Sequence, residues 1–306
     1  MKTMNNKLFK LLILILFIIT TESCEKKALN QSTKPNFSFA FITDIHIQPE
    51  SNAVEGFSVA LNMLNQLDPD FIVTGGDLIM DALGTTYGRA DTLYNLYLET
   101  IKKSNSKVYN TIGNHEIYGW YSHSKADPNH PEYGEKMFEK RIGKSYYTFE
   151  HKGWKFFILN SIEPSGKGGY IGLIDSLQME WVKSELVNTN AKTPIVLVTH
   201  IPLITINKQL YEGSTLPNDS SNVVVNSKEL LDLFKDHNVK LVLQGHLHTV
   251  EDIYVDGTHF VTGGAISGGW WKGPNMGYEE GFVWVDVFTD SISWKYIDYG
   301  WEVHKR

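Results

Sequence analysis

Short apolar stretches alternate with amphipathic stretches through most of the chain. Runs rich in Phe, Ile, Val and Leu predict buried strands at residues 37–43, 71–74, 108–112, 194–199 and 239–243. Apolar residues at helical spacing predict helices between them, at 54–64, 93–101, 177–186 and 226–234. Alternating patterns predict hairpins at 146–160, 253–262 and 282–297. Strands that alternate with helices and then give way to hairpins predict an α/β fold, with two sheets packed face to face and helices outside.

Polar residues mark the ends of several predicted helices. Asp68 and Pro69 end the first helix, because the residue before a proline avoids the helical conformation. Asp175 is a good N-cap for the helix that follows it. Asn226 and Glu229 resemble a capping box, which predicts that another helix begins there.

Metal-competent side chains follow the predicted strands, at the point where each strand ends. The blocks are Asp44-x-His46, Gly76-Asp77, Gly113-Asn114-His115-Glu116, His200 and Gly245-His246-x-His248. Ligands of open α/β sheets gather beyond the carboxyl ends of the strands, so we expect these side chains to meet. Imidazole and carboxylate ligands without a thiolate suit Zn, Fe, Mn or Co ions. The set is large enough for two ions if one carboxylate bridges them, and Asp77, alone at its glycine turn, is the natural bridge.

These five blocks, in this order, resemble those of the calcineurin-like phosphoesterases, a superfamily of metallophosphoesterases. The resemblance covers nearly all of residues 37–300 and implies a four-layer α/β/β/α sandwich of two mixed sheets flanked by helices. It also implies two ligand sets, namely Asp44, His46, Asp77 and His248 for one ion, and Asp77, Asn114, His200 and His246 for the other. His115 would point away from the metals and act as the general acid beside Asn114. The stretches 146–149 and 264–271 are similar to those of extracytoplasmic bacterial members.

We therefore expect a phosphoesterase that uses two transition-metal ions to hydrolyse small-molecule phosphate esters. Two ions about 3.5 to 4 Å apart give a bridging hydroxide at neutral pH and clamp the phosphoryl oxygens. Aromatic residues beside the blocks favour a phosphodiester or nucleotide-type substrate, because aromatic faces stack on bases and sugars. These residues are Tyr118, Trp120, Tyr121, Trp270 and Trp271. The alternative for the two tryptophans is that they pack their loop against the core.

Two other functions and one further ligand set stay open. The enzyme could be a phosphomonoesterase, because the metals recognise phosphate and only the surrounding loops contact the rest of the substrate. A non-catalytic, metal-bound scaffold is the other alternative, although such superfamily members lack several of the ligands that this chain retains. His123 and His130 lie in the long segment 117–135 and could add metal ligands, or be solvated.

Composition narrows the classes of partner. The 306-residue chain has a net charge of −7, so it lacks the basic surface on which nucleic-acid binding depends. A hydrophobic content of 42% with 21% charged residues is ordinary for a globular domain. We expect a small-molecule partner and a single domain at residues 37–306.

The N-terminal segment predicts export and lipid anchoring. Lys2, Lys7 and Lys10 precede an apolar run at residues 11–19, which is too short to span a bilayer and is typical of a signal peptide. Cys24, the single cysteine, follows it at a site that resembles lipoprotein processing sites. We expect a signal peptide at residues 1–23, a lipid on Cys24, a tether at 24–36 and a place in a bacterial envelope membrane. A plain secretory signal with an incidental free cysteine is the alternative.

Overall fold

The structure, a computed structural model, describes residues 34–289 and 291–303. The chain divides into two units, residues 1–35 and 36–306, and the fold below is that of the second unit. The predicted signal peptide, the lipid site at Cys24 and most of the predicted tether lie outside the described residues and stay predictions. No helix among the residues described here is long and apolar enough to cross a membrane.

The first apolar stretch of the domain forms β1, the central strand of a mixed five-stranded sheet. β1 pairs in parallel with β2, β2 pairs in parallel with β3, and β12 pairs antiparallel on the other side of β1. The strand order is β13 (Ile292–Asp298), β12 (Gly281–Val287), β1 (Phe37–Ile42), β2 (Phe71–Thr74) and β3 (Val108–Tyr109). The carboxyl ends of β1, β2 and β3 therefore lie at one edge of this sheet.

A second mixed sheet has six strands, with three parallel pairings at its centre. β5 pairs in parallel with β8, β8 with β9, and β9 with β11. The order is β10 (Val250–Val255), β11 (Thr258–Gly263), β9 (Asn238–Gln244), β8 (Pro194–Val198), β5 (Trp154–Ile158) and β4 (Tyr147–His151). A separate two-stranded ribbon joins β6 (Ile162–Pro164) to β7 (Tyr170–Gly172).

Alternate side chains of β1 pack on opposite faces of its sheet. Phe39 and Phe41 belong to the core between the two sheets, whereas Ala40 and Ile42 belong to the core beneath the helices. Phe39 stacks on Phe71 with ring centroids 5.0 Å apart, and it meets Phe156 of the second sheet edge to face at 5.5 Å. Full burial of each such ring contributes about 1.5–3 kcal/mol to stability. Because its alternate side chains enter different cores, β1 links the core between the sheets to the core beneath the helices.

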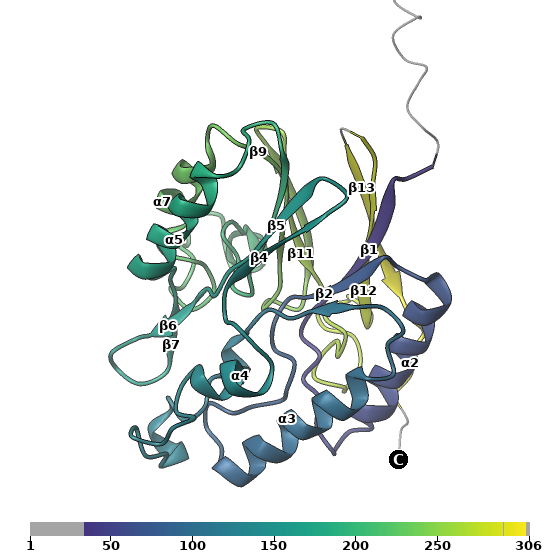
Figure 1. Ribbon diagram of the computed structural model, residues 1–306. Coiled ribbons are helices and arrows are strands. Elements are labelled where there is room, and N and C mark those ends of the chain that lie inside the picture. Colours follow the sequence, from purple (N-terminus) through teal and green to yellow (C-terminus); the bar gives the residue numbers. More distant parts are fainter. Residues whose placement is uncertain (1–33, 290, 304–306) are drawn as a thin grey trace, which may run out of the picture. The chain divides into compact units, whose positions relative to one another are not determined.

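Helices cover the outer faces of both sheets and complete the predicted four-layer α/β/β/α sandwich. Figure 1 shows α2 and α3 on one side of the molecule and α5 and α7 on the other. These helices span Ala53–Leu67 (α2), Tyr87–Ile101 (α3), Ser176–Val187 (α5) and Ser227–Phe234 (α7). The shorter ones are α4 (Lys136–Arg141), α6 (Asn207–Tyr211) and the 3₁₀ turns Asn114–Glu116 and Ser122–Ser124. The prediction of fold class is confirmed.

Three local predictions meet different outcomes. Asp175 caps α5 as expected, because its Oδ1 accepts the Gln178 N–H at 2.6 Å. The capping box at Asn226 is wrong: this side chain instead bonds both the N–H and the C=O of Ile174, at 3.1 and 2.8 Å. β3 ends before the predicted residue 112, because the Thr111 N–H turns to the side chain of Thr74.

Candidate metal centre

The five polar blocks meet beyond the carboxyl ends of β1, β2, β3, β8 and β9. Many of the residues that carry them have a left-handed backbone, which costs a non-glycine residue roughly 1–2 kcal/mol. Their φ angles are 54° for Asp44, 46° for His46, 51° for Asp77, 73° for His246 and 54° for His248. Strained backbone of this kind persists where the surroundings fix it, and it is common at functional sites.

Two glycines allow the blocks to approach one another. A Cβ atom on Gly113 would lie 2.1 Å from the backbone nitrogen of Asp77. One on Gly245 would lie 2.1 Å from Oγ1 of Thr43. A side chain at either position would push two strand ends apart, so these glycines are needed for close backbone approach rather than for a turn.

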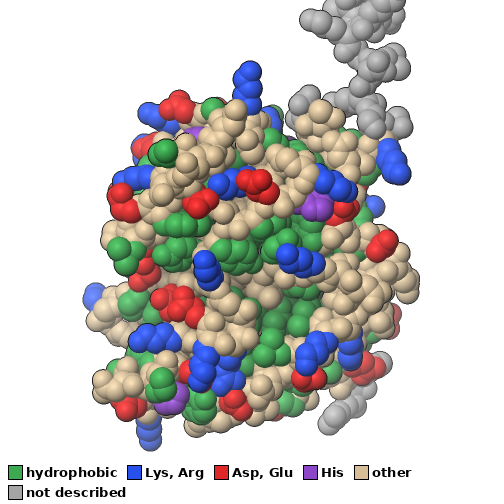
Figure 2. Space-filling view, viewed as in Figure 1, with side chains coloured by type: hydrophobic (Ala, Val, Ile, Leu, Met, Phe, Trp, Pro, Cys, Tyr) green, Lys and Arg blue, Asp and Glu red, His purple; other side chains and the backbone are tan. Residues whose placement is uncertain are grey.

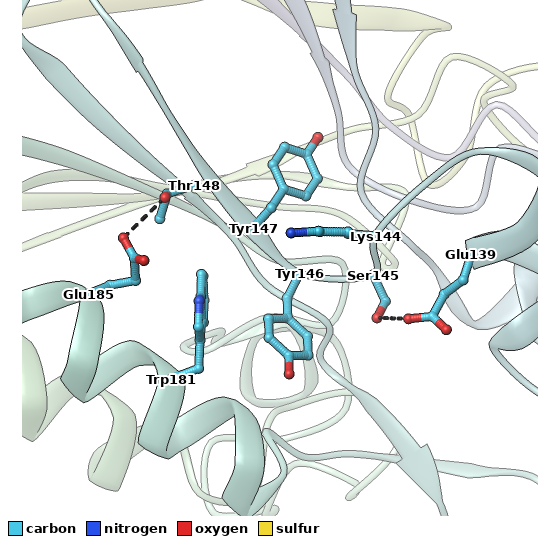
Figure 3. Close-up of a pocket in the computed structure, with 8 residues that line it drawn as sticks. All are labelled: Glu139, Lys144, Ser145, Tyr146, Tyr147, Thr148, Trp181 and Glu185. Carbon is cyan, nitrogen blue, oxygen red and sulfur yellow. Dashed lines mark hydrogen bonds between the residues drawn. The ribbon is translucent and has the colours of Figure 1, made fainter.

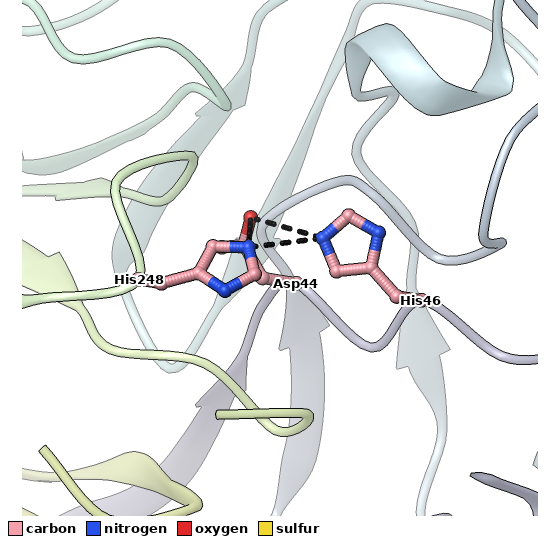
Figure 4. A group of neighbouring side chains, drawn as sticks. All are labelled: Asp44, His46 and His248. Atoms are coloured by element: carbon pink, nitrogen blue, oxygen red, sulfur yellow. Dashed lines mark hydrogen bonds and ion pairs between the residues drawn. The ribbon is translucent and has the colours of Figure 1, made fainter. Parts of the chain in front are cut away.

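The first group of ligand atoms comes from Asp44, His46 and His248 (Figure 4). The Nε2 atoms of His46 and His248 are 3.0 Å apart, and His248 Nε2 is 3.3 Å from Asp44 Oδ1. All three side chains are buried. Their lone-pair atoms face one another across a small space in which a cation would satisfy all of them.

The second group contains Asp77, Asn114, His200 and His246. His200 Nε2 lies 3.2 Å from Asp77 Oδ2, 3.0 Å from Asn114 Oδ1 and 3.2 Å from His246 Nδ1. Asp77 Oδ2 is also 3.7 Å from His46 Nε2 in the first group. The Asp77 carboxylate therefore stands between the two groups, where a bridging ligand would stand.

Hydrogen bonds to backbone carbonyls orient two of the histidines. His200 Nδ1 donates to the Gly75 carbonyl at 2.7 Å, and His248 Nδ1 donates to the Gly268 carbonyl at 2.6 Å. Each bond fixes a proton on Nδ1 and directs Nε2 into the site, as in many metal-ligating histidines. His200 Nε2 lies 3.0 Å from the Asn114 amide oxygen and 3.2 Å from Asp77 Oδ2, so a metal ion that replaced its proton would be bound by all three side chains. This donor set fits transition-metal ions.

Charge in the centre is shared between carboxylates and imidazoles. Burial disfavours the charged form of Asp77, but His200 and His115 outweigh it and hold the pKa of Asp77 well below its usual range. Burial alone would lower the pKa of His200, but Asp77 raises it to about 9. Burial and the neighbouring His200 lower the pKa of His246 to about 3. His246 is thus a neutral ligand, with its Nδ1 toward the site.

His115 lies beside Asp77 rather than away from the ligands. Its backbone N–H donates to Asp77 Oδ1 at 2.9 Å, and its Nε2 is 3.8 Å from Asp77 Oδ2. Its Nδ1 donates to the Met80 carbonyl. The ring meets His46 edge to face at 4.6 Å. The backbone of His115 is thus bonded to the Asp77 carboxylate, and its Nε2 faces the site, where it forms a further candidate metal-binding group with His46 and Asp77.

Glu116 is an important residue of the centre to which the sequence analysis gave no role. Its buried carboxylate accepts four backbone N–H groups, from Gly113, Asp77, Leu78 and Ile79, at 2.7 to 3.1 Å. Burial and the Asp77 charge raise the pKa of Glu116 to about 8. The carboxylate fastens the loop after β3 to the loop after β2. Its position directly after Asn114 and His115 was the signal in the sequence that could have identified it as part of the centre.

The two adjacent tryptophans have different environments. Trp270 is 40% exposed, and its ring lies 4.6 Å from the His248 ring and 6.0 Å from that of His46. Trp271 is 1% exposed, and its Nε1 donates to the carbonyls of Ile45 and His46 at 3.0 and 3.1 Å. The prediction that Trp271 contacts substrate is therefore corrected: its ring is buried against α2 and supports the first ligand block. Of the two tryptophans, Trp270 is the one that borders the site.

The three aromatic residues after His115 each pack against other parts of the protein. Tyr118 is only 5% exposed and packs edge to face on Tyr87, so it offers no face to a substrate. Trp120 packs along Gly134 within its own loop and is partly buried. Tyr121 stacks on His123 at 5.4 Å. His123 and His130 belong to none of the potential metal-binding groups found among the described residues.

A pocket of about 450 Å³ lies elsewhere, between β4, α4 and α5 (Figure 3). Figure 2 shows the surface of the molecule from the same side as Figure 1. Apolar side chains gather across the middle of this surface, with Lys and Arg side chains above and below them. The pocket is lined by Glu139, Lys144, Ser145, Tyr146, Tyr147, Thr148, Trp181 and Glu185. Its acids are already bonded, Glu139 to Ser145 at 3.0 Å and Glu185 to Thr148 at 3.2 Å. The pocket contains none of the converging ligand atoms.

The four-layer fold brings histidines and carboxylates from both sheets together at one candidate metal centre. The sequence profile of the calcineurin-like phosphoesterases matches residues 37–250, and the chain belongs to this family. The family is one of metal-dependent phosphoesterases, as the sequence resemblance predicted.

Comparison with individual proteins supports the fold. A dimetal phosphatase from Danio rerio has a TM-score of 0.61 at 14% identity, over 87% of this chain and 98% of that one. GAP50 of Plasmodium, "the anchor in the inner membrane complex", has a TM-score of 0.56 at 17% identity, over 89% of this chain and 88% of that one. A Caenorhabditis elegans protein named "putative metallophosphoesterase" is 34% identical over 86 residues, which is 28% of this chain and 16% of that protein. The match therefore spans only a small part of that relative.

Proposed function

We propose that the protein is a phosphoesterase that works with two transition-metal ions, such as Mn, Fe, Zn or Co. Asp44, His46 and His248 would hold one ion, and Asn114, His200 and His246 would hold the other, with Asp77 shared. The position of the Asp77 carboxylate carries the proposal, because its Oδ2 lies 3.2 Å from His200 Nε2 and 3.7 Å from His46 Nε2. Both distances run to Oδ2, whereas Oδ1 accepts the His115 N–H, so this one oxygen would serve both groups.

The residues around the ligands suit phosphoryl transfer. Two bound ions would supply an activated water and neutralise the charge that develops on the phosphoryl oxygens. Asn114 contributes a neutral amide oxygen, which keeps the centre cationic toward phosphate. His115 holds its Nδ1 proton on the Met80 carbonyl, so Nε2 is the atom that exchanges a proton at the site. We assign it the protonation of the leaving oxygen.

The exposed ring of Trp270 suggests where the leaving group lies. Trp270 and His115 both flank His46, with ring centroids at 6.0 and 4.6 Å from it. A flat or ring-bearing alcohol stacked on Trp270 would have its oxygen within reach of His115. Base or ring stacking on an aromatic side chain contributes about 1–3 kcal/mol. We therefore favour a phosphodiester or nucleotide-type ester over a simple alkyl monoester.

The substitution His115→Ala tests this assignment. The variant should bind as much metal as the wild-type protein, since none of the ligand side chains changes. Its kcat should fall by roughly 10²- to 10⁴-fold for an alkyl phosphate, the usual contribution of a positioned acid. The loss should be much smaller for nitrophenyl phosphate, because nitrophenolate leaves without a proton. His259→Ala is the matched control, because His259 pairs with Asp252 on the β10–β11 hairpin.

Two results would count against the proposal. Equal losses for good and poor leaving groups would remove His115 from the role of acid. Elemental analysis that finds only one ion per fully loaded chain would contradict a shared Asp77.

A further inference from the structure

Two polar side chains border the centre on the His246 side, and the sequence analysis singled out neither. Tyr170 of β7 meets the His246 ring nearly perpendicularly, at 86°, with centroids 6.1 Å apart. Asn222 places its Oδ1 3.3 Å from His246 Nε2, where it accepts the proton of that neutral ring. Both residues therefore lie against the same ligand, whereas Trp270 lies against His248 and His46.

Both side chains keep donors that no described residue uses. Within residues 34–289 and 291–303, neither the Tyr170 hydroxyl nor the Asn222 amide NH₂ donates a hydrogen bond to the protein. A phenol is protonated at neutral pH, so the Tyr170 hydroxyl remains a donor. The Asn222 oxygen accepts from His246, which leaves the NH₂ group to point elsewhere.

The backbone holds these two residues in a fixed relation. The Gly172 N–H donates to the Ser220 carbonyl at 2.7 Å, and the Val225 N–H donates to the Gly172 carbonyl at 2.8 Å. The Val224 N–H donates in turn to Pro202, just after ligand His200, at 2.8 Å. The β6–β7 ribbon and the segment that carries Asn222 are thus bonded to each other and to the loop that carries His200.

Neutral donors matter here because cationic side chains are absent from the ligand set. No Lys or Arg among the described residues forms a hydrogen bond or ion pair with the seven predicted ligands or with His115. A phosphoryl group spreads its charge over three equatorial oxygens, and enzymes stabilise it by donors placed in advance. Oxygens that the metals leave uncovered need protein donors.

We propose that Tyr170 and Asn222 form a donor pair that binds a phosphoryl oxygen of the substrate on the His246 side of the centre. This assignment rests on the proposed phosphoesterase function and deepens it. The phosphoryl group then has two distinct borders: hydrogen-bond donors at Tyr170 and Asn222, and an aromatic face with a proton donor at Trp270 and His115. The ester is oriented with its leaving group toward Trp270.

The test uses inorganic phosphate as the probe, so it does not depend on turnover. Titration calorimetry of the metal-loaded protein should show that Tyr170→Phe weakens phosphate binding by about 10- to 100-fold, the worth of one hydrogen bond to a charged group. Metal content and Tm should match the wild-type protein, because the ring remains in place. Tyr146→Phe, in the pocket of Figure 3, is the matched control and should bind phosphate as the wild-type protein does.

A second variant, Asn222→Asp, keeps the oxygen that accepts from His246 and removes the amide donor. It should lose at least as much affinity for phosphate as Tyr170→Phe while it retains two ions. Wild-type affinity in both metal-loaded variants would overturn the donor pair, even if the enzyme hydrolyses esters normally. Failure of the wild-type protein to bind two ions or to hydrolyse any ester would instead overturn the proposed function.

Discussion

At the scale of single residues, the centre depends on strained backbone that neighbouring loops hold in place. Asp44 and His46 have left-handed φ angles of 54° and 46°. Their N–H groups donate to the Gly76 and Asp77 carbonyls at 3.1 and 2.9 Å, and the Asp44 carbonyl accepts the Ser267 hydroxyl at 2.8 Å. Two other parts of the chain thus fix one Asp-x-His block and orient its ligand atoms.

Trp271 extends this support beneath the first ligand block, and its removal should weaken metal binding. Its indole N–H is shared by the carbonyls of Ile45 and His46. A Cβ on Gly56 would lie 2.3 Å from the Trp271 ring, so a glycine inside α2 makes room for the indole. Trp271→Phe keeps a ring but loses this donor. We expect about 10-fold weaker affinity for the first metal, as for other residues that orient ligands.

Metal titrations of Trp271→Phe and of a control, Trp284→Phe, test whether Trp271 supports metal binding or only fills the core. Trp284 is also buried, but its Nε1 donates to Asp286 Oδ1 at 2.9 Å on β12. A loss of Tm in both variants with normal metal affinity in both would show that Trp271 only fills the core. Weakened metal binding confined to Trp271→Phe would support its role beneath the Asp44-x-His46 block.

At the scale of elements, the sequence predicted those with a clear period and missed those without one. β1, β2, β8 and β9 are rich in apolar residues, and the polar residues after them were enough to predict where a metal centre forms. The β6–β7 ribbon has only three residues in each strand, with Pro164 and Gly172 among them. Short strands that contain breakers leave no alternation to detect. Tyr170 was missed because its ribbon was missed.

The β6–β7 ribbon also carries a titrating carboxyl group that should make stability depend on pH. Burial, with Asp175 and Glu135 nearby, raises the pKa of Glu163 to about 7 from its ordinary 4.5. The folded chain therefore holds the proton more tightly than the unfolded chain. This contribution to stability is fully present below about pH 4.5 and is lost as the pH rises through about 7.

Glu163→Gln should remove that dependence. At pH 8 the wild-type protein must keep an ionised Glu163 partly buried, which costs about 1 kcal/mol after solvent screening. The variant avoids this cost and should melt roughly 2–4 °C above the wild-type protein. At pH 4 the two proteins should melt together, because both then carry a neutral side chain. Glu212→Gln, an exposed carboxyl beyond α6, is the control and should show no such difference. A constant difference at both pH values would mean that Glu163 acts through packing alone.

At the scale of the whole molecule, the centre joins the two sheets. Asp44, Asp77 and Asn114 follow strands of the five-stranded sheet, whereas His200 and the two histidines after β9 follow strands of the six-stranded sheet. Each predicted ligand group contains residues from both sheets. The pattern of the residues could predict the order of the blocks, but their pairing depends on sheet packing, and only the resemblance to the family implied it.

Removal of metal should therefore destabilise the entire fold and not only the loops that carry the ligands. An ion at 1,000 times its Kd adds about 4 kcal/mol to the free energy of unfolding, or about 10 °C in Tm for a domain of this size. Calorimetric scans of metal-loaded and chelator-treated protein should show this difference in a single transition, because both sheets lose a shared cross-link. The double variant Asp44→Asn, His200→Gln should melt alike with and without chelator, since each ion loses a ligand. If the metal-loaded and the chelator-treated wild-type proteins melt within about one degree of each other, metal binding does not stabilise the fold and the prediction is wrong.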